Sequence, residues 1–169
     1  TVERSADRLV MRGAGTAPCI YVAARGSRAR YLGAAFTVPP GTDLASLARA
    51  SKGRELAADE IPGGGRGIEL IDPAGHALWL LQDRPSVAAM PVRDALVAGT
   101  NTLTHKPRVN AGVRAPVVPA DVVRIGHMVL QTVDFPTMAD WYMRHLGLIP
   151  TDVQYLADGS PALCFFRLD

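Results

Sequence analysis

The sequence has little of what marks several specialised classes of protein. Its 169 residues include 2 cysteines and 6% aromatic residues, and its apolar runs fall far short of the roughly 20 residues that a membrane helix needs. Cys19 and Cys164 each stand alone in an apolar run, so they form neither a metal-binding nor a redox spacing. We interpret both as small buried side chains in a reducing compartment. We therefore expect a cytoplasmic protein with no membrane segment.

The charge pattern also excludes a class of partner. The formal net charge is only +2 and its charges are spread along the chain, so nothing favours nucleic acid as a partner. The densest basic stretch, residues 25–30, is interpreted as a solvated loop between strands. The run Gly63-Gly64-Gly65 lacks the Lys-Ser/Thr of a phosphate-binding loop and predicts a turn. A hydrophobic content of 48% instead favours a packed core.

The first half of the sequence predicts short strands separated by glycine and proline, with one helix among them. Asp43 is placed to cap this helix, which should run to about Ser51 with Gly53 beyond its end. The tetrapeptide at residues 72–75, Asp-Pro-Ala-Gly, has the residues of a type I turn and predicts a β-hairpin. The predicted strands are residues 9–12, 18–24, 31–38, 67–71 and 76–82.

The pattern changes at Asp83. Residues 83–121 contain five prolines and no sustained periodicity, which is typical of a linker or a functional loop. Residues 122–133 then predict a long strand. Asp134 should cap a second helix, with Pro136 in its first turn and Gly147 at its end. The last predicted strands are residues 148–155 and 162–168, around a turn at residues 157–160.

The order of these elements repeats. The unit β-α-β-β-β occurs once whole, once without its beginning and once without its end, although the residues themselves barely repeat. The sequence therefore predicts an α+β protein made of βαβββ modules. We expect an N-terminal domain at residues 1–82 with an incomplete first module, a linker at 83–121, and the opening module of a second domain at 122–169. We also expect the chain to be incomplete, because it would otherwise leave an unpaired strand edge.

Two stretches carry a resemblance to a known family. The first is Gly126-His127-Met128-Val129-Leu130, followed by Asp134-Phe135 and a helix that ends at Leu146-Gly147-Leu148. The second is the hairpin of residues 70–76, Leu-Ile-Asp-Pro-Ala-Gly-His. In this order they resemble the opening and closing parts of modules in the vicinal-oxygen-chelate superfamily, which includes glyoxalases, bleomycin-resistance proteins and extradiol dioxygenases. The layout of two domains and a linker is most similar to the type I extradiol ring-cleavage dioxygenases.

The resemblance implies a fold and a chemistry. The fold would be βαβββ modules paired into cup-shaped mixed sheets. The chemistry would be the opening of a catechol-like aromatic diol by O₂ at a mononuclear, non-haem Fe(II) or possibly Mn(II). Such a site uses two histidines and one carboxylate on one face of the metal. His127 matches the first histidine, and it should share the face of its strand with Val123, Ile125 and Val129. The alternative is a purely structural role, in which His127 is a core histidine with its hydrogen bonds satisfied.

The other candidates carry less chemistry. The carboxylate of the closing hairpin would fall at Trp79, so the N-terminal domain resembles the metal-free scaffold of the two-domain enzymes. His76 is interpreted as a surface or hairpin-packing residue, and His145 as a helix-terminal cation. His105, on the linker, could reach a site. Trp141 and Tyr142 are interpreted as core residues.

The resulting hypothesis is an oxygenase that takes a small aromatic diol and O₂, acting as a homo-oligomer. The second histidine and the carboxylate ligand should come from residues beyond Asp169, and the sequence identifies no catalytic acid or base. The alternative is a non-oxygenase of the same superfamily, either a glyoxalase-type lyase or isomerase or a small-molecule-binding resistance protein.

Overall fold

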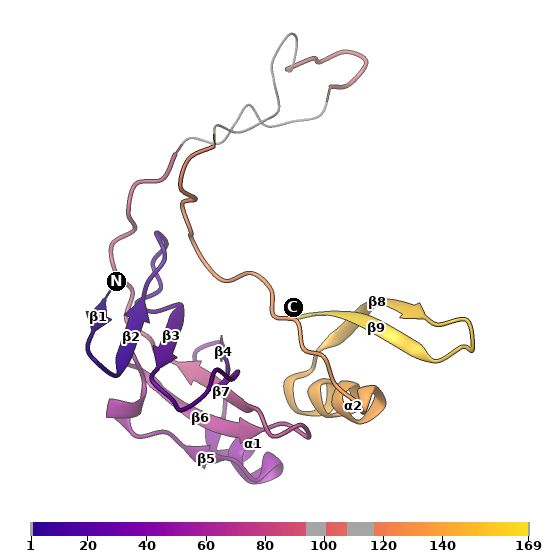
Figure 1. Cartoon of the computed structure of the whole chain (residues 1–169), viewed down its shortest axis with the longest axis horizontal. Helices are drawn as coiled ribbons and strands as arrows, with labels where there is room; N and C mark the ends of the chain where they lie inside the picture. The colour runs from indigo at the N-terminus through magenta and orange to yellow at the C-terminus, as the bar shows by residue number, and fades with distance from the viewer. Residues whose placement is uncertain (1, 94–100, 108–116, 169) are drawn as a thin grey trace. The chain divides into compact units, whose positions relative to one another are not determined.

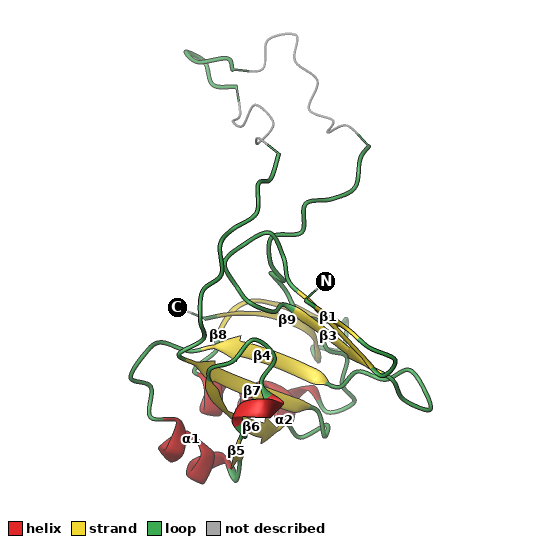
Figure 2. Ribbon diagram, turned by 90° about the vertical axis from the view of Figure 1, so that its left-hand side faces the viewer, coloured by secondary structure: helices red, strands yellow, loops and turns green. Residues whose placement is uncertain are grey.

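The computed structural model describes residues 2–93, 101–107 and 117–168. Their contacts divide the chain into two units, and each unit combines distant stretches of sequence. The first contains residues 1–23 and 86–125, and the second contains residues 24–85 and 126–169. Figure 1 follows the chain through its elements, and Figure 2 separates the helices from the strands. The domain boundaries predicted after residues 82 and 121 concern the whole protein, and they remain a prediction.

The first unit contains a three-stranded sheet in the order β1 (Glu3–Arg4), β2 (Arg8–Met11) and β3 (Tyr21–Ala24). The predicted strand at residues 18–24 is thus shorter than expected, and β1 was not predicted. Parts of the predicted linker are attached to this unit by backbone hydrogen bonds. The N–H of Met90 donates to the carbonyl of Ala14, whose own N–H donates to the carbonyl of Val122, both at 2.8 Å. The Arg12 guanidinium adds a hydrogen bond to the Ala88 carbonyl.

The second unit contains one whole βαβββ module. Its elements are β4 (Gly33–Thr37), α1 (Leu44–Ser51), β5 (Arg54–Glu55), the short 3₁₀ helix η1 (Ala58–Glu60), β6 (Arg66–Ile71) and β7 (Ala77–Gln82). The strand order is β4-β7-β6-β5, with β4 parallel to β7 and the other neighbours antiparallel. The predicted module and the predicted hairpin are therefore confirmed. In this order the opening strand β4 has a single neighbour, the closing strand β7.

Helix α1 forms and packs as its sequence predicts. The Asp43 side chain accepts a hydrogen bond from the backbone N–H of Ser46 at 2.9 Å, which satisfies one of the free donors at the start of the helix. The helix ends at Ser51, as predicted, and its C-cap residue Lys52 adopts the left-handed conformation one residue before Gly53. Its buried residues Leu44 and Ala48 join the sheet residues Ile68, Leu70, Leu78 and Leu80 in one apolar cluster.

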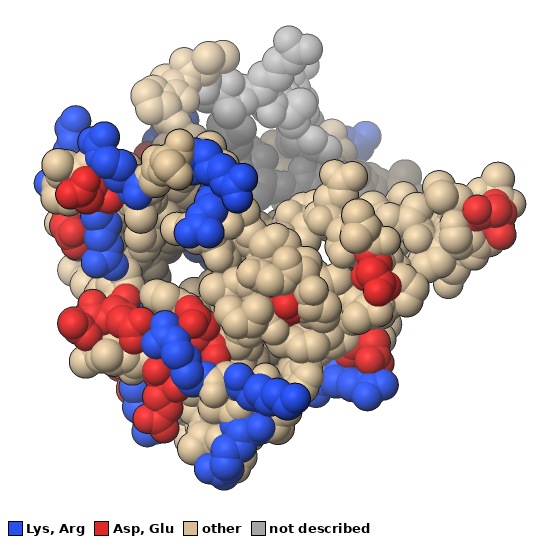
Figure 3. Space-filling model, turned by 60° about the horizontal axis from the view of Figure 1, so that its bottom comes forward, with Lys and Arg blue, Asp and Glu red and all other residues tan. Residues whose placement is uncertain are grey.

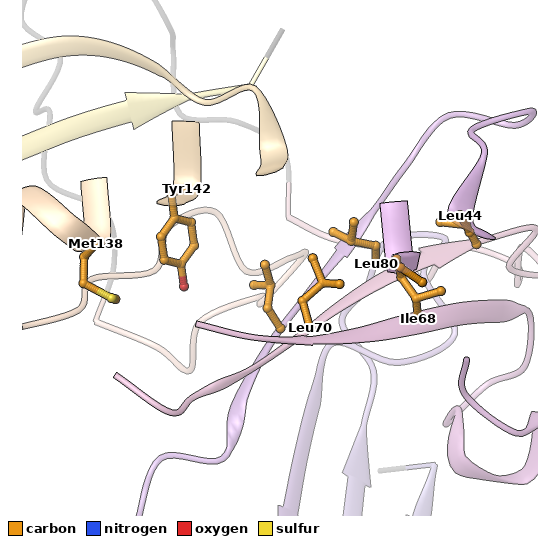
Figure 4. Close-up of a cluster of buried hydrophobic side chains, with 8 residues drawn as sticks. Leu44, Ile68, Leu70, Leu80, Met138 and Tyr142 are labelled. Carbon is orange, nitrogen blue, oxygen red and sulfur yellow. The ribbon is translucent and has the colours of Figure 1, made fainter. Parts of the chain in front are cut away.

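The same unit contains part of a second module. Helix α2 (Phe135–Leu146) is followed by an antiparallel pair of strands, β8 (Ile149–Tyr155) and β9 (Pro161–Arg167). Asp134 caps α2 and Gly147 ends it in the left-handed conformation, as predicted. Met138 and Tyr142 of α2 belong to the apolar cluster of the first module. Figure 4 shows both side chains extending from α2 toward the sheet residues.

The strand predicted for residues 122–133 is wrong. The structure describes this stretch and assigns it neither strand nor helix. The strand order of the first module supplies the physical reason. An opening strand such as β4 takes its hydrogen bonds from a closing strand such as β7, and among the described residues no strand follows β9 to play that part. A strand requires a continuous row of backbone partners on a neighbour. The described backbone bonds to this stretch are those from the N–H groups of Ala14 and Gly15 to the carbonyls of Val122 and Val123, which do not make a strand.

The surface matches the expectation of mixed charge. Figure 3 shows lysine and arginine interspersed with aspartate and glutamate on the face in view. Several of these side chains pair: Arg54 contacts both Glu60 and Glu69 at 2.8 Å, and Arg66 contacts Asp83 at 2.8 Å. Across residues 2–93, 101–107 and 117–168, no helix has both the length and the apolar character needed to cross a membrane.

Candidate functional site

His127 lies on a stretch whose side chains alternate between core and solvent. Met128 and Leu130 are partly buried against the apolar cluster of the second unit. His127, which precedes Met128, and Val129, which lies between Met128 and Leu130, are exposed. The alternation predicted for a strand is therefore present from His127 onward, although the strand is not, whereas residues 122–126 are all exposed. It places His127 on the side of residues 126–131 that faces away from the core, so the imidazole is open to a ligand.

The described residues do not complete a metal site around this histidine. Within them, no group of three or more histidine, cysteine, aspartate or glutamate side chains is arranged to hold a metal ion. A metal of the expected type needs about three protein ligands. The described part of the chain therefore offers His127 as one donor and does not by itself fit a mononuclear centre, so we derive no chemical step through a metal.

The face of the sheet opposite α1 is occupied by an apolar and ionic cluster. Trp79 is partly buried against Leu56, Ile61 and Leu81, and its indole N–H donates to Glu69 at 2.8 Å. Glu69 also accepts from Arg54, which binds Glu60 through two further hydrogen bonds. The hydrogen bonds from Arg54 lower the pKa of Glu60 to about 2. At the position where the resemblance implied a carboxylate, Trp79 thus engages the carboxylate of its cross-strand neighbour.

A second polar cluster surrounds Asp72 at the turn of the β6–β7 hairpin. Asp72 is 3% exposed, and one carboxylate oxygen accepts the backbone N–H groups of Ala74 and His76 at 2.9 and 2.8 Å. The other oxygen lies 3.1 Å from Nδ1 of His76 and accepts the hydroxyl of Tyr142 at 3.2 Å. Because a carboxylate can only accept, this contact requires a proton on Nδ1 of His76. The cluster joins the hairpin of one module to the helix of the other.

Tyr31 extends this cluster. Its ring packs edge-on against the His76 ring, with centroids 5.2 Å apart, and its hydroxyl lies 3.1 Å from the sulfur of Met128. Burial and the Asp72 charge raise the pKa of Tyr31. The same two causes, together with the hydrogen bond to Asp72, strongly raise the pKa of Tyr142. Both phenols therefore stay protonated over the physiological range and act as hydrogen-bond donors. We call Asp72, His76, Tyr142 and Tyr31 the Asp72 cluster.

The remaining predicted candidates lie elsewhere. His105 is exposed on the described stretch 101–107, where its backbone N–H donates to Thr102. His145, in the last turn of α2, packs against Trp141 and has its Nδ1 3.0 Å from the Ser51 hydroxyl. Gly63, Gly64 and Gly65 all have positive φ and form a turn, as predicted. Cys19 and Cys164 are free thiols.

Only part of the Asp72 cluster can be predicted from the sequence. The spacing of Asp72 and His76 across a four-residue turn is a local signal, since an aspartate that begins such a turn often accepts nearby N–H groups. Tyr142 lies 70 residues beyond Asp72, and Tyr31 lies 97 residues before Met128. Neither long-range contact has a signature in the sequence. For that reason the sequence alone predicts a core residue at Tyr142 and a strand residue at Tyr31.

Comparison with known proteins adds a likeness to a solved structure. No protein-family model matches the sequence, and no curated protein does. Among solved structures, the chain is similar to the crystal structure of the Mn(II)-bound glyoxalase from Novosphingobium aromaticivorans, with a TM-score of 0.66 and 20% sequence identity. The likeness covers 98% of this chain and 48% of that chain, so this chain spans about half its length. The fold is therefore glyoxalase-like, which confirms the predicted α+β fold of βαβββ modules.

Proposed function

We propose that this chain belongs to a metal-dependent enzyme in which His127 is one ligand of a divalent ion that chelates two adjacent oxygens of a small substrate. The observation that carries the proposal is the placement of His127: Met128 and Leu130 pack into the core, and the imidazole stands on the opposite, open side. The likeness to a Mn(II)-bound glyoxalase supports a divalent metal on this fold. The remaining ligands would come from outside the described residues.

The finer form of the proposal is an extradiol ring-cleavage dioxygenase that uses Fe(II) or Mn(II). It rests on the resemblance of residues 126–148 and 70–76 to those enzymes. A metal in such a site acts as a Lewis acid and template for the two diol oxygens, with O₂ as the second substrate. Val129, which is exposed with His127, is apolar, which suits an aromatic ring better than a highly charged substrate. We further propose that the enzyme acts as a homo-oligomer.

A second candidate is a glyoxalase-type isomerase or lyase. The specific observation in its favour is that the similar structure is a glyoxalase and not an oxygenase. Both candidates use a divalent metal to hold two adjacent oxygens. They differ in their need for O₂, so one measurement separates them.

The ligand role of His127 is tested by metal content. In the full-length protein, the His127→Ala variant should lose most bound manganese or iron after gel filtration, because a mononuclear site that loses one of about three ligands no longer retains the ion. The matched control is His105→Ala, which removes an equally exposed histidine from another stretch of the chain. Elemental analysis that found equal metal in His127→Ala, His105→Ala and the unmodified protein would refute the assignment.

The reaction is tested by oxygen consumption. Protein loaded with Fe(II) or Mn(II) should consume one O₂ per molecule of a hydrophobic catechol and form a yellow ring-opened acid. The same preparation is then given a hemithioacetal under anaerobic conditions, where only an isomerase would turn over. Turnover without O₂ would replace the dioxygenase by the second candidate. Turnover of neither substrate class, with metal shown to be bound, would contradict both.

A further inference from the structure

Residues 126–131 are held in place without the backbone pairing of a strand. No described backbone hydrogen bond in this stretch links it to the rest of the second unit. Its attachments are the packing of Met128 and Leu130 against the apolar cluster and the hydrogen bond from the Tyr31 hydroxyl to the Met128 sulfur. Thioether sulfur is a weak acceptor, so this bond orients the Met128 side chain more than it strengthens the fold.

The position of the Tyr31 ring is in turn supported by His76 and Asp72. Its ring packs at 71° against the ring of His76, and Nδ1 of His76 is held 3.1 Å from the buried carboxylate of Asp72. Two backbone N–H groups of the hairpin lock the other oxygen of Asp72. Tyr31 therefore packs against a hydrogen-bonded turn, although the Tyr31 side chain is itself partly exposed to solvent.

The same carboxylate also fixes the helix that follows residues 126–131. Tyr142 of α2 donates to Asp72 within the core. The stretch that carries His127 is thus held at Met128, through Tyr31 and His76, and at its far end, through α2 and Tyr142. Both attachments converge on Asp72.

We propose that Tyr31 is a positioning residue for the His127 stretch, and that it acts through Met128 with His76 and Asp72 as its support. With Met128 turned into the core by Tyr31, the adjacent imidazole is directed outward. The positioning role of Tyr31 does not depend on the proposed function. Only the reason for placing His127 outward, as a metal ligand, rests on that proposal.

The test follows the exposure of Met128 without any metal. Tyr31→Phe removes the hydroxyl and keeps the ring against His76, so the Met128 sulfur should become more accessible and oxidise about threefold or more faster in dilute peroxide. His76→Gln removes the ring that supports Tyr31 and should have the same effect. Since both changes act through one contact, the double variant should oxidise no faster than the faster single variant. Peptide mass spectrometry gives the rate at each methionine.

Several controls separate positioning from general loosening of the fold. Met143, on α2, should keep its oxidation rate in every variant. Tyr155→Phe and His105→Gln, which change an exposed tyrosine and an exposed histidine, should leave Met128 at the rate of the unmodified protein. An unchanged Met128 rate in Tyr31→Phe, or equal acceleration at Met143, would overturn the inference. The outcome does not depend on whether His127 binds a metal, so the proposed function can fail while the positioning role stands.

Discussion

Replacing Tyr142 by phenylalanine tests how strongly the Asp72 cluster joins the two modules. Tyr142 is 8% exposed, and its hydroxyl donates to the buried Asp72 carboxylate at 3.2 Å. A hydrogen bond to a charged group contributes about 1.5–3 kcal/mol, and this one is long. Asp72 keeps its bonds to the hairpin N–H groups and to His76 in the variant. We therefore expect Tyr142→Phe to lower the free energy of unfolding by about 1–2 kcal/mol at pH 7.

The same variant should change the response to alkaline pH. The folded-state pKa of Tyr142 is raised well above its ordinary value of 10, first by burial and then by Asp72. A group whose pKa is raised on folding contributes stability that is fully present below its unfolded pKa and is lost as pH rises toward the folded one. Above pH 10 the unmodified protein should thus lose up to about 1.4 kcal/mol per pH unit from this phenol. Phenylalanine cannot ionise, so the variant does not share this loss. The difference in the free energy of unfolding between the variant and the unmodified protein should therefore become smaller as the pH rises above 10.

Urea denaturation at pH 7.5, 9, 10.5 and 11.5 measures both effects. The fluorescence of Trp141 is a local probe, because its ring lies 5.0 Å from the ring of Tyr142. Tyr155→Phe is the matched control: Tyr155 is 65% exposed, and its loss should change stability by less than about 0.5 kcal/mol. A Tyr142→Phe effect as small as the control at pH 7.5, or one that stays constant up to pH 11.5, would refute the account of the Asp72 cluster.

Two further predictions concern the core and a helix cap. Leu70 is 0% exposed in the apolar cluster, so Leu70→Ala should cost about 2–5 kcal/mol in urea denaturation; Leu103→Ala, at a fully exposed position, should have almost no effect. Asp134 caps α2 through the N–H of Thr137, so Asp134→Ala should lower the thermal midpoint by roughly 2–4 °C while Asp134→Asn preserves it. Equal midpoints for the two Asp134 variants would argue against the cap.

Local signals predicted most of the fold. Both helices begin at the aspartate that was expected to cap them, and they end within one residue of the expected position. The hairpin around residues 72–75 forms at a turn whose residues each favour the local backbone conformation. Each of these features depends on a few neighbouring residues, which is the range over which a sequence pattern carries information.

The features that the sequence did not predict depend on distant partners. Residues 122–133 alternate as a strand would, but pairing is decided by another stretch of backbone, and a strand pattern alone cannot report whether that stretch is present. The Asp72 cluster likewise combines a turn, a helix and an irregular segment that are far apart in sequence. Its members were each interpreted by their local setting, as turn, core and strand residues.

The contrast between the two opening segments explains how His127 can be placed without a strand. In the first module, backbone bonds to β7 fix β4, and Ala34 and Phe36 of β4 also pack against the apolar cluster. Residues 126–131 have only the side-chain packing, in which Met128 and Leu130 contact the same apolar cluster. Side-chain packing fixes which face of a segment is buried, whereas backbone pairing fixes its register. The side of the segment on which His127 lies is therefore already determined in this structure, while the register of the segment against a neighbouring strand is not.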